Sequence, residues 1–195
     1  MGQDNRSAGL NPPPADFLNG ALIMRILFFD TATRTGFAFG DGQSMPIWGH
    51  FTLQRTGDQV APFLFDANVR IAEVVDRFAP DLVGFESPLL RGRDDPRKLR
   101  KLYGLVSEVE KVAWKRKIDC REVSLGEIRT HFLGRGYPRN SERIKIAVCN
   151  RARQLGWDVA VDDEADALAG LDFLLSIKRP GHALRVTPMF AKERA

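Results

Sequence analysis

Four short apolar runs and one short mixed segment, residues 119–123, predict β-strands along the chain. Each run is bounded by glycine, proline or polar residues, which is typical of strands. The first three runs follow one another closely, and the turn GDGQ separates the second from the third, which predicts an antiparallel meander. The five expected strands cover residues 25–31, 36–40, 47–53, 81–86 and 119–123.

Between and after these strands, apolar residues recur at the spacing of α-helices. Pro80 ends the first long helix, and Ser124 with Glu127 forms a capping box that begins a shorter one. The order β-β-β-α-β-α-β-α-α-α predicts an α/β fold with a mixed five-stranded sheet flanked by helices. The helices are expected at about 60–78, 96–117, 124–133, 141–154 and 162–177.

The length of 195 residues suits one folded domain. Residues 1–23 are largely polar and include three consecutive prolines, so a flexible leader is expected there. We place the folded domain at residues 24–178 and a mixed, basic tail at residues 179–195.

The composition fits a globular protein outside the membrane, with 44% hydrophobic and 28% charged residues. No apolar run approaches the ~20 residues of a membrane span, and the start has no signal-peptide pattern, so a cytoplasmic location is expected. The formal net charge is +4 and the isoelectric point is about 9.3. This basic balance fits a nucleic-acid partner without requiring one.

Four carboxylates stand where an α/β fold gathers functional groups. Asp30 ends the first strand and Glu86 ends the fourth, and the carboxyl ends of parallel strands meet at one edge of a sheet. Asp163 and Asp166 are three residues apart at the start of the last helix, so they share one helix face. A strand-terminal acid is more often a turn residue, and an acidic helix start is usually capping, so no single signal suffices.

Taken together, the four acids predict a metal site. Carboxylates brought close together repel one another unless a cation neutralises them, and Mg²⁺ prefers carboxylate oxygen. Two such ions about 4 Å apart can hold both the attacking water and the leaving oxygen of a phosphodiester. Asp162 competes with Asp163 for this role. The spacing to Asp166 favours Asp163, which leaves Asp162 as the helix cap and Glu164 pointing away.

Three segments resemble the motifs of RuvC-type Holliday-junction resolvases. ILFFDTATRTGFAF is similar to their first strand and hairpin, PDLVGFESP to their second motif and DEADALAG to their last. The resemblance covers most of residues 24–177 and implies a ribonuclease-H-like fold. It also implies a homodimer that nicks four-way DNA junctions during recombination and repair. The metal-binding catalytic tetrad would be Asp30, Glu86, Asp163 and Asp166. It would bind Mg²⁺, for which Mn²⁺ could substitute.

The sequence departs from this family at two points. The family commonly has Pro-Gly soon after the first acid, where this chain has Thr31 and Ala32. It also has an aromatic residue that stacks on bases shortly after the glutamate, where this chain has Leu89 and Leu90. A divergent or phage-type member of the family is therefore expected.

Two basic clusters neighbour the acidic positions along the chain. One follows Glu86 and the other spans the loop GRGYPRN. A run of charge usually lies on a solvated face, but an acidic metal cluster needs nearby cations to attract a polyanion. Corresponding segments of RuvC-like proteins grip phosphates. The resemblance thus implies DNA contacts for Arg91, Arg93, Arg97, Lys98, Lys101, Arg129, Arg135, Arg139, Arg143 and Lys145.

Other chemically distinctive side chains are expected to be structural. His131 could serve as an acid or base, although a single histidine near a helix end is more often structural. Cys120 and Cys149 lack zinc-ligand spacing and are expected to be reduced, buried thiols. The tryptophans expected in or beside the core are Trp48, Trp114 and Trp157.

Three other functions compete with this interpretation. A nuclease of the same fold could cut RNA–DNA hybrids or flaps, and its motifs would look alike. A non-catalytic DNA-binding protein could share the fold, although the presence of all four acids argues against lost catalysis. A sugar-kinase-type ATP-binding domain would need a duplicated domain and glycine-rich phosphate loops, and the sequence contains neither.

Overall fold

The computed structural model describes residues 17–18, 21–22, 24–88, 95–179 and 182 of the chain. The predicted strands and helices are confirmed in type and order, with ends that differ by a few residues. The elements are β1 (Phe17–Leu18), β2 (Ala21–Leu22), β3 (Ile26–Asp30), β4 (Arg34–Gly40), β5 (Ile47–Thr52), α1 (Ala61–Phe78), β6 (Leu82–Glu86), α2 (Pro96–Lys115), β7 (Asp119–Val123), α3 (Leu125–Leu133), α4 (Ser141–Gln154) and α5 (Asp162–Lys178).

The main sheet has five strands in the order β5-β4-β3-β6-β7. β3, β4 and β5 form the predicted antiparallel meander, and β6 and β7 extend it in parallel with β3. The predicted α/β fold with a mixed five-stranded sheet is thereby confirmed. Most of the expected leader and tail lies outside the described residues, but β1 and β2 pair as a separate antiparallel ribbon.

Strand β3 is central because both of its faces are covered. Ile26 and Phe28 pack into a core formed with α3, α4 and α5. Leu27 and Phe29 point the other way, into a core formed with α1 and α2. An unbroken apolar run is therefore required here, since a strand alternates its side chains between two buried faces.

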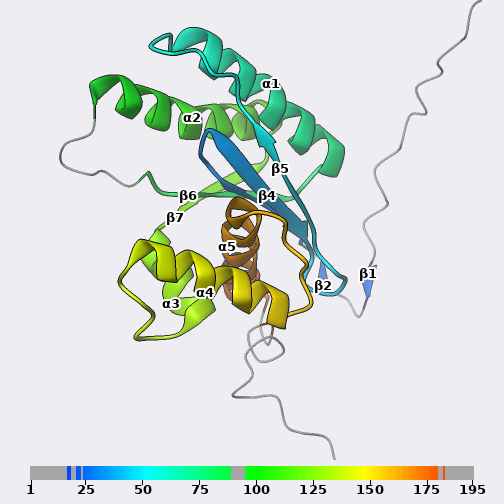
Figure 1. The fold of residues 1–195 in the computed structure, drawn as a ribbon. Helices are drawn as coiled ribbons and strands as arrows, with labels where there is room; N and C mark the ends of the chain where they lie inside the picture. Colours follow the sequence, from blue (N-terminus) through cyan, green and yellow to red (C-terminus); the bar gives the residue numbers. More distant parts are fainter. Residues whose placement is uncertain (1–16, 19–20, 23, 89–94, 180–181, 183–195) are drawn as a thin grey trace, which may run out of the picture.

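The helices form two layers, one on each face of the sheet (Figure 1). α1 and α2 lie together on one face, and α5 crosses the other face with α3 and α4 beside it. α5 approaches the sheet closely at Gly170, where an added Cβ would lie 2.1 Å from the ring of Phe28. No real contact is that short, so a side chain at this position would push α5 away from β3.

The helix ends follow the predicted signals. Ser124 and Glu127 form the capping box of α3, with both reciprocal hydrogen bonds present. α1 ends at Ala79, which adopts a left-handed conformation with φ of 43° directly before Pro80. None of the described helices combines the length and apolar character that spanning a lipid bilayer requires.

Two expectations about burial are wrong. Trp114 is 78% exposed, because it lies on the outer face of α2. Its neighbours Val112 and Ala113 lie on the face of α2 that packs into the core. Cys120 is exposed, because β7 is an edge strand whose side chains are poorly covered. Both cysteines are free, as expected, and Trp157 is buried while Trp48 is partly buried against the same core.

Candidate active site

The four predicted acids meet at the end of the sheet where the interior strands β3 and β6 finish. Asp30 and Glu86 end β3 and β6, which are adjacent and parallel, so both acids stand at the same end. The antiparallel strand β4 places Gly36 opposite Asp30. Gly36 in turn lies against the main chain of Asp163, where an added Cβ would be 2.0 Å from the carbonyl oxygen. This contact places the first turn of α5 beside the strand ends.

Three of these acids form a partly buried inner group: Asp30, Glu86 and Asp166. Burial raises the pKa of Asp30 well above its usual range, and the charges of Glu86 and Asp166 raise it further. Burial also raises the pKa of Glu86 to about 7, with a contribution from Asp166. For Asp166, burial raises the pKa to about 6. Ionising all three acids of the inner group is therefore unfavourable, because they are buried beside one another.

Arg129 on α3 supplies part of that compensation. Its positive charge lowers the pKa of both Glu86 and Asp166, against the larger effect of burial. The Nε atom of Arg129 is buried and has no hydrogen-bond partner among the described residues. Arg129 therefore acts on the inner group through its charge.

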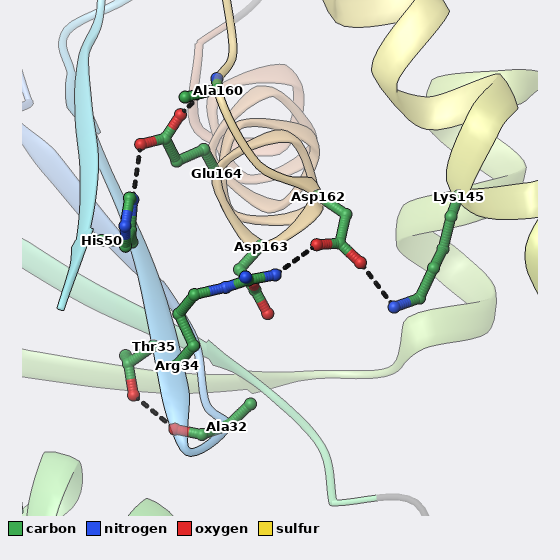
Figure 2. A network of polar contacts seen from close by, with 9 residues as sticks. All are labelled: Ala32, Arg34, Thr35, His50, Lys145, Ala160, Asp162, Asp163 and Glu164. Atoms are coloured by element: carbon green, nitrogen blue, oxygen red, sulfur yellow. Dashed lines mark hydrogen bonds and ion pairs between the residues drawn. The ribbon is translucent and has the colours of Figure 1, made fainter. Parts of the chain in front are cut away.

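The outer acids, Asp162 and Asp163, are held by two cationic side chains (Figure 2). The Nε of Arg34 donates to Asp163, and its Nη2 donates to Oδ1 of Asp162 at 2.5 Å. The Nζ of Lys145 donates to the second oxygen of Asp162, and this contact is the largest cause of the lowered pKa of Asp162. The expectation that Asp162 caps α5 is wrong, because Val161 occupies the N-cap position and Asp162 already lies in the helix.

Glu164 points away from the other acids, as predicted. Its Oε1 lies 2.8 Å from Nδ1 of His50 on β5, and its Oε2 accepts a hydrogen bond from the main chain of Ala160 at 2.8 Å (Figure 2). Glu164 is buried, and its contact with His50 ties the start of α5 to the edge strand β5 rather than to the acidic site.

The inner group has the donor chemistry for a hard divalent cation. Its three carboxylates supply only oxygen, and their pKa values are raised by burial and, to a smaller extent, by the neighbouring acids, whose charge a cation would neutralise. Within the described residues, no three histidine, cysteine, aspartate or glutamate side chains are already arranged around a common metal position. Cation binding would therefore draw the carboxylates inward.

The predicted basic residues divide into two groups. Arg91 and Arg93 lie outside the described residues, as do Leu89 and Leu90. Arg97 pairs with Asp58, and Lys101 donates to Thr56 and to the carbonyl of Gly57, so these two residues join α2 to the segment before α1. Lys98 is exposed.

The second basic group lies nearer the acids. Arg129 and Lys145 act directly on the acidic residues, as described above. Arg135, Arg139 and Arg143 are exposed on the loop after α3 and on the first turn of α4. These positions leave their charges available to a polyanion.

His131 belongs to a separate buried cluster. Its Nε2 lies 2.8 Å from one carboxylate oxygen of Asp172 on α5, and Nε2 of His182 lies 2.8 Å from the other. Burial alone would raise the pKa of Asp172, but the hydrogen bonds from the two histidines outweigh it and lower the pKa. The arrangement supports the structural interpretation of His131.

Arg34 is the site residue that sequence reasoning missed. The signal was present: β4 returns antiparallel to β3, so a residue at its start comes back to the end where Asp30 lies. Arg34 also has the same parity along β4 as Gly36, so it points toward α5.

The strand order and the helices on both faces of the sheet give this protein a ribonuclease-H-like fold. The sequence matches no protein-family model and no curated protein. Among solved structures, Thermus thermophilus RuvC superposes with a TM-score of 0.60 and 18% identity, covering 80% of this chain and 97% of RuvC. T. thermophilus RuvC in complex with a Holliday junction substrate superposes with a TM-score of 0.63 and 19% identity, covering 82% of this chain and 97% of that RuvC chain. The yeast mitochondrial Holliday junction resolvase Ydc2 superposes with a TM-score of 0.58 and 12% identity, covering 86% of this chain and 82% of Ydc2. These similarities establish the shared fold.

Proposed function

We propose that this protein is a metal-dependent endonuclease that resolves Holliday junctions or related branched DNA by paired nicking. The observation that carries the proposal is the convergence of Asp30, Glu86, Asp163 and Asp166 at one edge of the sheet. The fold is shared with RuvC solved on a Holliday junction substrate and with the yeast resolvase Ydc2, which supports the substrate class.

The acids would hold Mg²⁺, with Mn²⁺ as a substitute. Bound divalent cations would supply Lewis acidity that promotes phosphodiester hydrolysis. Asp30, Glu86 and Asp166 contribute oxygen ligands from two strands and one helix, and a rigid sheet edge fixes the positions from which they act. Asp163 would complete the set from the outer side.

The exposed cations beside the site would bind the DNA backbone. Arg135, Arg139 and Arg143 lie on the α3–α4 loop and the start of α4, and Lys145 follows on the same helix. Their charge offsets the negative potential of the acids, which would otherwise repel phosphates.

A homodimer would match the approximate two-fold symmetry of a four-way junction, with one site for each cut strand. The outer face of α2 is the proposed contact, because it exposes Trp114 and Tyr103, and large aromatic residues are enriched in protein interfaces.

The decisive experiment is cleavage of a four-way junction labelled on each strand, compared with duplex, flap and RNA–DNA hybrid substrates in Mg²⁺. Asp166→Asn is expected to lower the rate at least about a hundredfold, because a neutral amide is a poor cation ligand. Asp119→Asn is the matched control, since Asp119 begins β7 at the opposite end of the sheet.

Unchanged cleavage by Asp166→Asn would remove the proposed role of the acids. Cleavage of hybrids or flaps in preference to junctions would instead support a nuclease of different specificity on the same fold. Junction binding in EDTA, with no cleavage after Mg²⁺ or Mn²⁺ is added, would support a non-catalytic DNA-binding protein.

A further inference from the structure

The five acids at the site differ in how their charge is balanced. Asp30, Glu86 and Asp166 are partly buried; the charge of Arg129 offsets that of Glu86 and Asp166, and the charge of Lys145 also offsets that of Asp166. Asp162 and Asp163 instead make direct contacts with Arg34 and Lys145. The inner acids are thus open to an added cation, whereas the outer acids already have protein cations.

Arg34 holds the outer acids in a forked contact. Its Nε binds Oδ2 of Asp163 and its Nη2 binds Oδ1 of Asp162 at 2.5 Å. Lys145 takes the remaining oxygen of Asp162, so Asp162 stands between two cations (Figure 2). Two oppositely directed partners fix Asp162, while Asp163 depends on Arg34.

The exposure of these side chains makes the contact with Asp163 exchangeable. The side chain of Arg34 is 42% exposed and that of Asp163 is 15% exposed. A partly solvated arginine can turn into water at small cost, because an exposed ion pair contributes little net stability. A divalent ion at Asp163 would require this departure, since it needs the same carboxylate and repels the guanidinium.

We propose, on the basis of the function proposed above, that Arg34 is a built-in counter-ion that competes with a divalent cation for Asp163. The inner acids take a first cation while Arg34 stays in place. A second cation binds at Asp163 only when Arg34 leaves, so Arg34 sets the concentration of metal at which the site fills.

Titration of the full-length, metal-free protein with Mn²⁺ tests this proposal, with bound and free Mn²⁺ measured by calorimetry and electron paramagnetic resonance. In Arg34→Gln, the weaker binding class is expected to tighten by about tenfold or more, because a competing charge is lost. Arg34→Lys keeps the charge and should stay nearer the wild type. Arg25→Gln is the matched control, since Arg25 makes a comparable forked contact with Asp81 near the start of β3.

The outcomes separate this proposal from the function on which it rests. If wild-type protein binds no Mn²⁺ in either class, the metal site itself is wrong. If wild-type protein binds Mn²⁺ and Arg34→Gln leaves the weaker class unchanged, the metal site stands and the counter-ion role is overturned. Weaker binding in Arg34→Gln would also overturn it, because Arg34 would then orient Asp163 rather than compete for it. A thermal melt of each variant confirms that it is folded.

Discussion

Gly36 on β4 and Asp163 on α5 share a contact that leaves no room for a side chain. An added Cβ at Gly36 would lie 2.0 Å from the carbonyl oxygen of Asp163 and 2.5 Å from its carbonyl carbon. The two atoms belong to main chain, so the obstacle cannot rotate away. The close approach of α5 to the sheet, and with it the position of Asp166, depends on this glycine.

Gly36→Ala is therefore expected to destabilise the protein by about 1–3 kcal/mol, the usual cost of overpacking. It should also weaken Mn²⁺ binding, because the start of α5 must move away from Asp30. Gly126→Ala on α3 is the control, since an added Cβ there meets nothing within 4 Å. Chemical denaturation and Mn²⁺ titration measure both effects, and a variant that matches the wild type in both would show that this contact does not position the site.

The inner acids should make the metal-free protein less stable as pH rises. The pKa of Glu86 is raised from its ordinary value of 4.5 to about 7 in the folded protein. An acid with a raised folded pKa favours the unfolded chain once that chain ionises, so stability falls as pH rises through this window. Glu86→Gln should flatten this fall. Denaturation in EDTA at several pH values between 4.5 and 7 tests the expectation, and parallel curves for the two proteins would contradict it.

Arg129 should lower the pH at which Glu86 and Asp166 ionise. Burial raises the pKa of Glu86 and Asp166, and Arg129 opposes that rise. Without that opposing charge the two carboxyls hold their protons more tightly, so in metal-free Arg129→Gln the NMR titration midpoints of Glu86 and Asp166 are expected to shift to higher pH. Arg135→Gln, which removes an exposed charge on the following loop, should leave both midpoints in place. A shift to lower pH in Arg129→Gln would refute this role.

The buried cluster around Asp172 should contribute to stability and not to cleavage. Asp172→Asn removes a carboxylate that accepts hydrogen bonds from His131 and His182, at an expected cost of about 2–4 kcal/mol. Because the folded pKa of Asp172 is lowered, its contribution is present above the ordinary value of 3.8 and is lost as pH falls. The difference from wild type should therefore shrink in acid. Equal stability at neutral pH would count against the cluster, and loss of junction cleavage by folded protein would show a further role.

The proposed dimer contact is tested by Trp114→Ser. This change removes a large exposed aromatic side chain from α2 and is expected to shift the protein toward monomer in sedimentation equilibrium. Ile146→Ser on α4 is the control, because it also removes an exposed apolar side chain but lies in the opposite helical layer. Equal dissociation constants for both variants and the wild type would exclude the outer face of α2.

Local sequence patterns determine most of the fold of this protein. The apolar run at Ile26 to Phe29 predicts a strand buried on two faces, and the structure places its alternate residues in two cores. The capping box at Ser124 and the stop at Pro80 mark helix ends through bonds and clashes within a few residues. Such signals can be recognised in the sequence because they depend only on residues that are close to one another along the chain.

The sequence also predicted that Asp30 and Glu86 lie together, because each ends a predicted strand and parallel strands bring their carboxyl ends together. The partners of the acids were decided only in three dimensions. Arg34 meets Asp162 and Asp163 across more than a hundred positions of sequence, through the register of β4 and the seating of α5 on Gly36. Periodicity shows which face of an element is buried, but which charge meets which depends on how elements pack, and that information is not local.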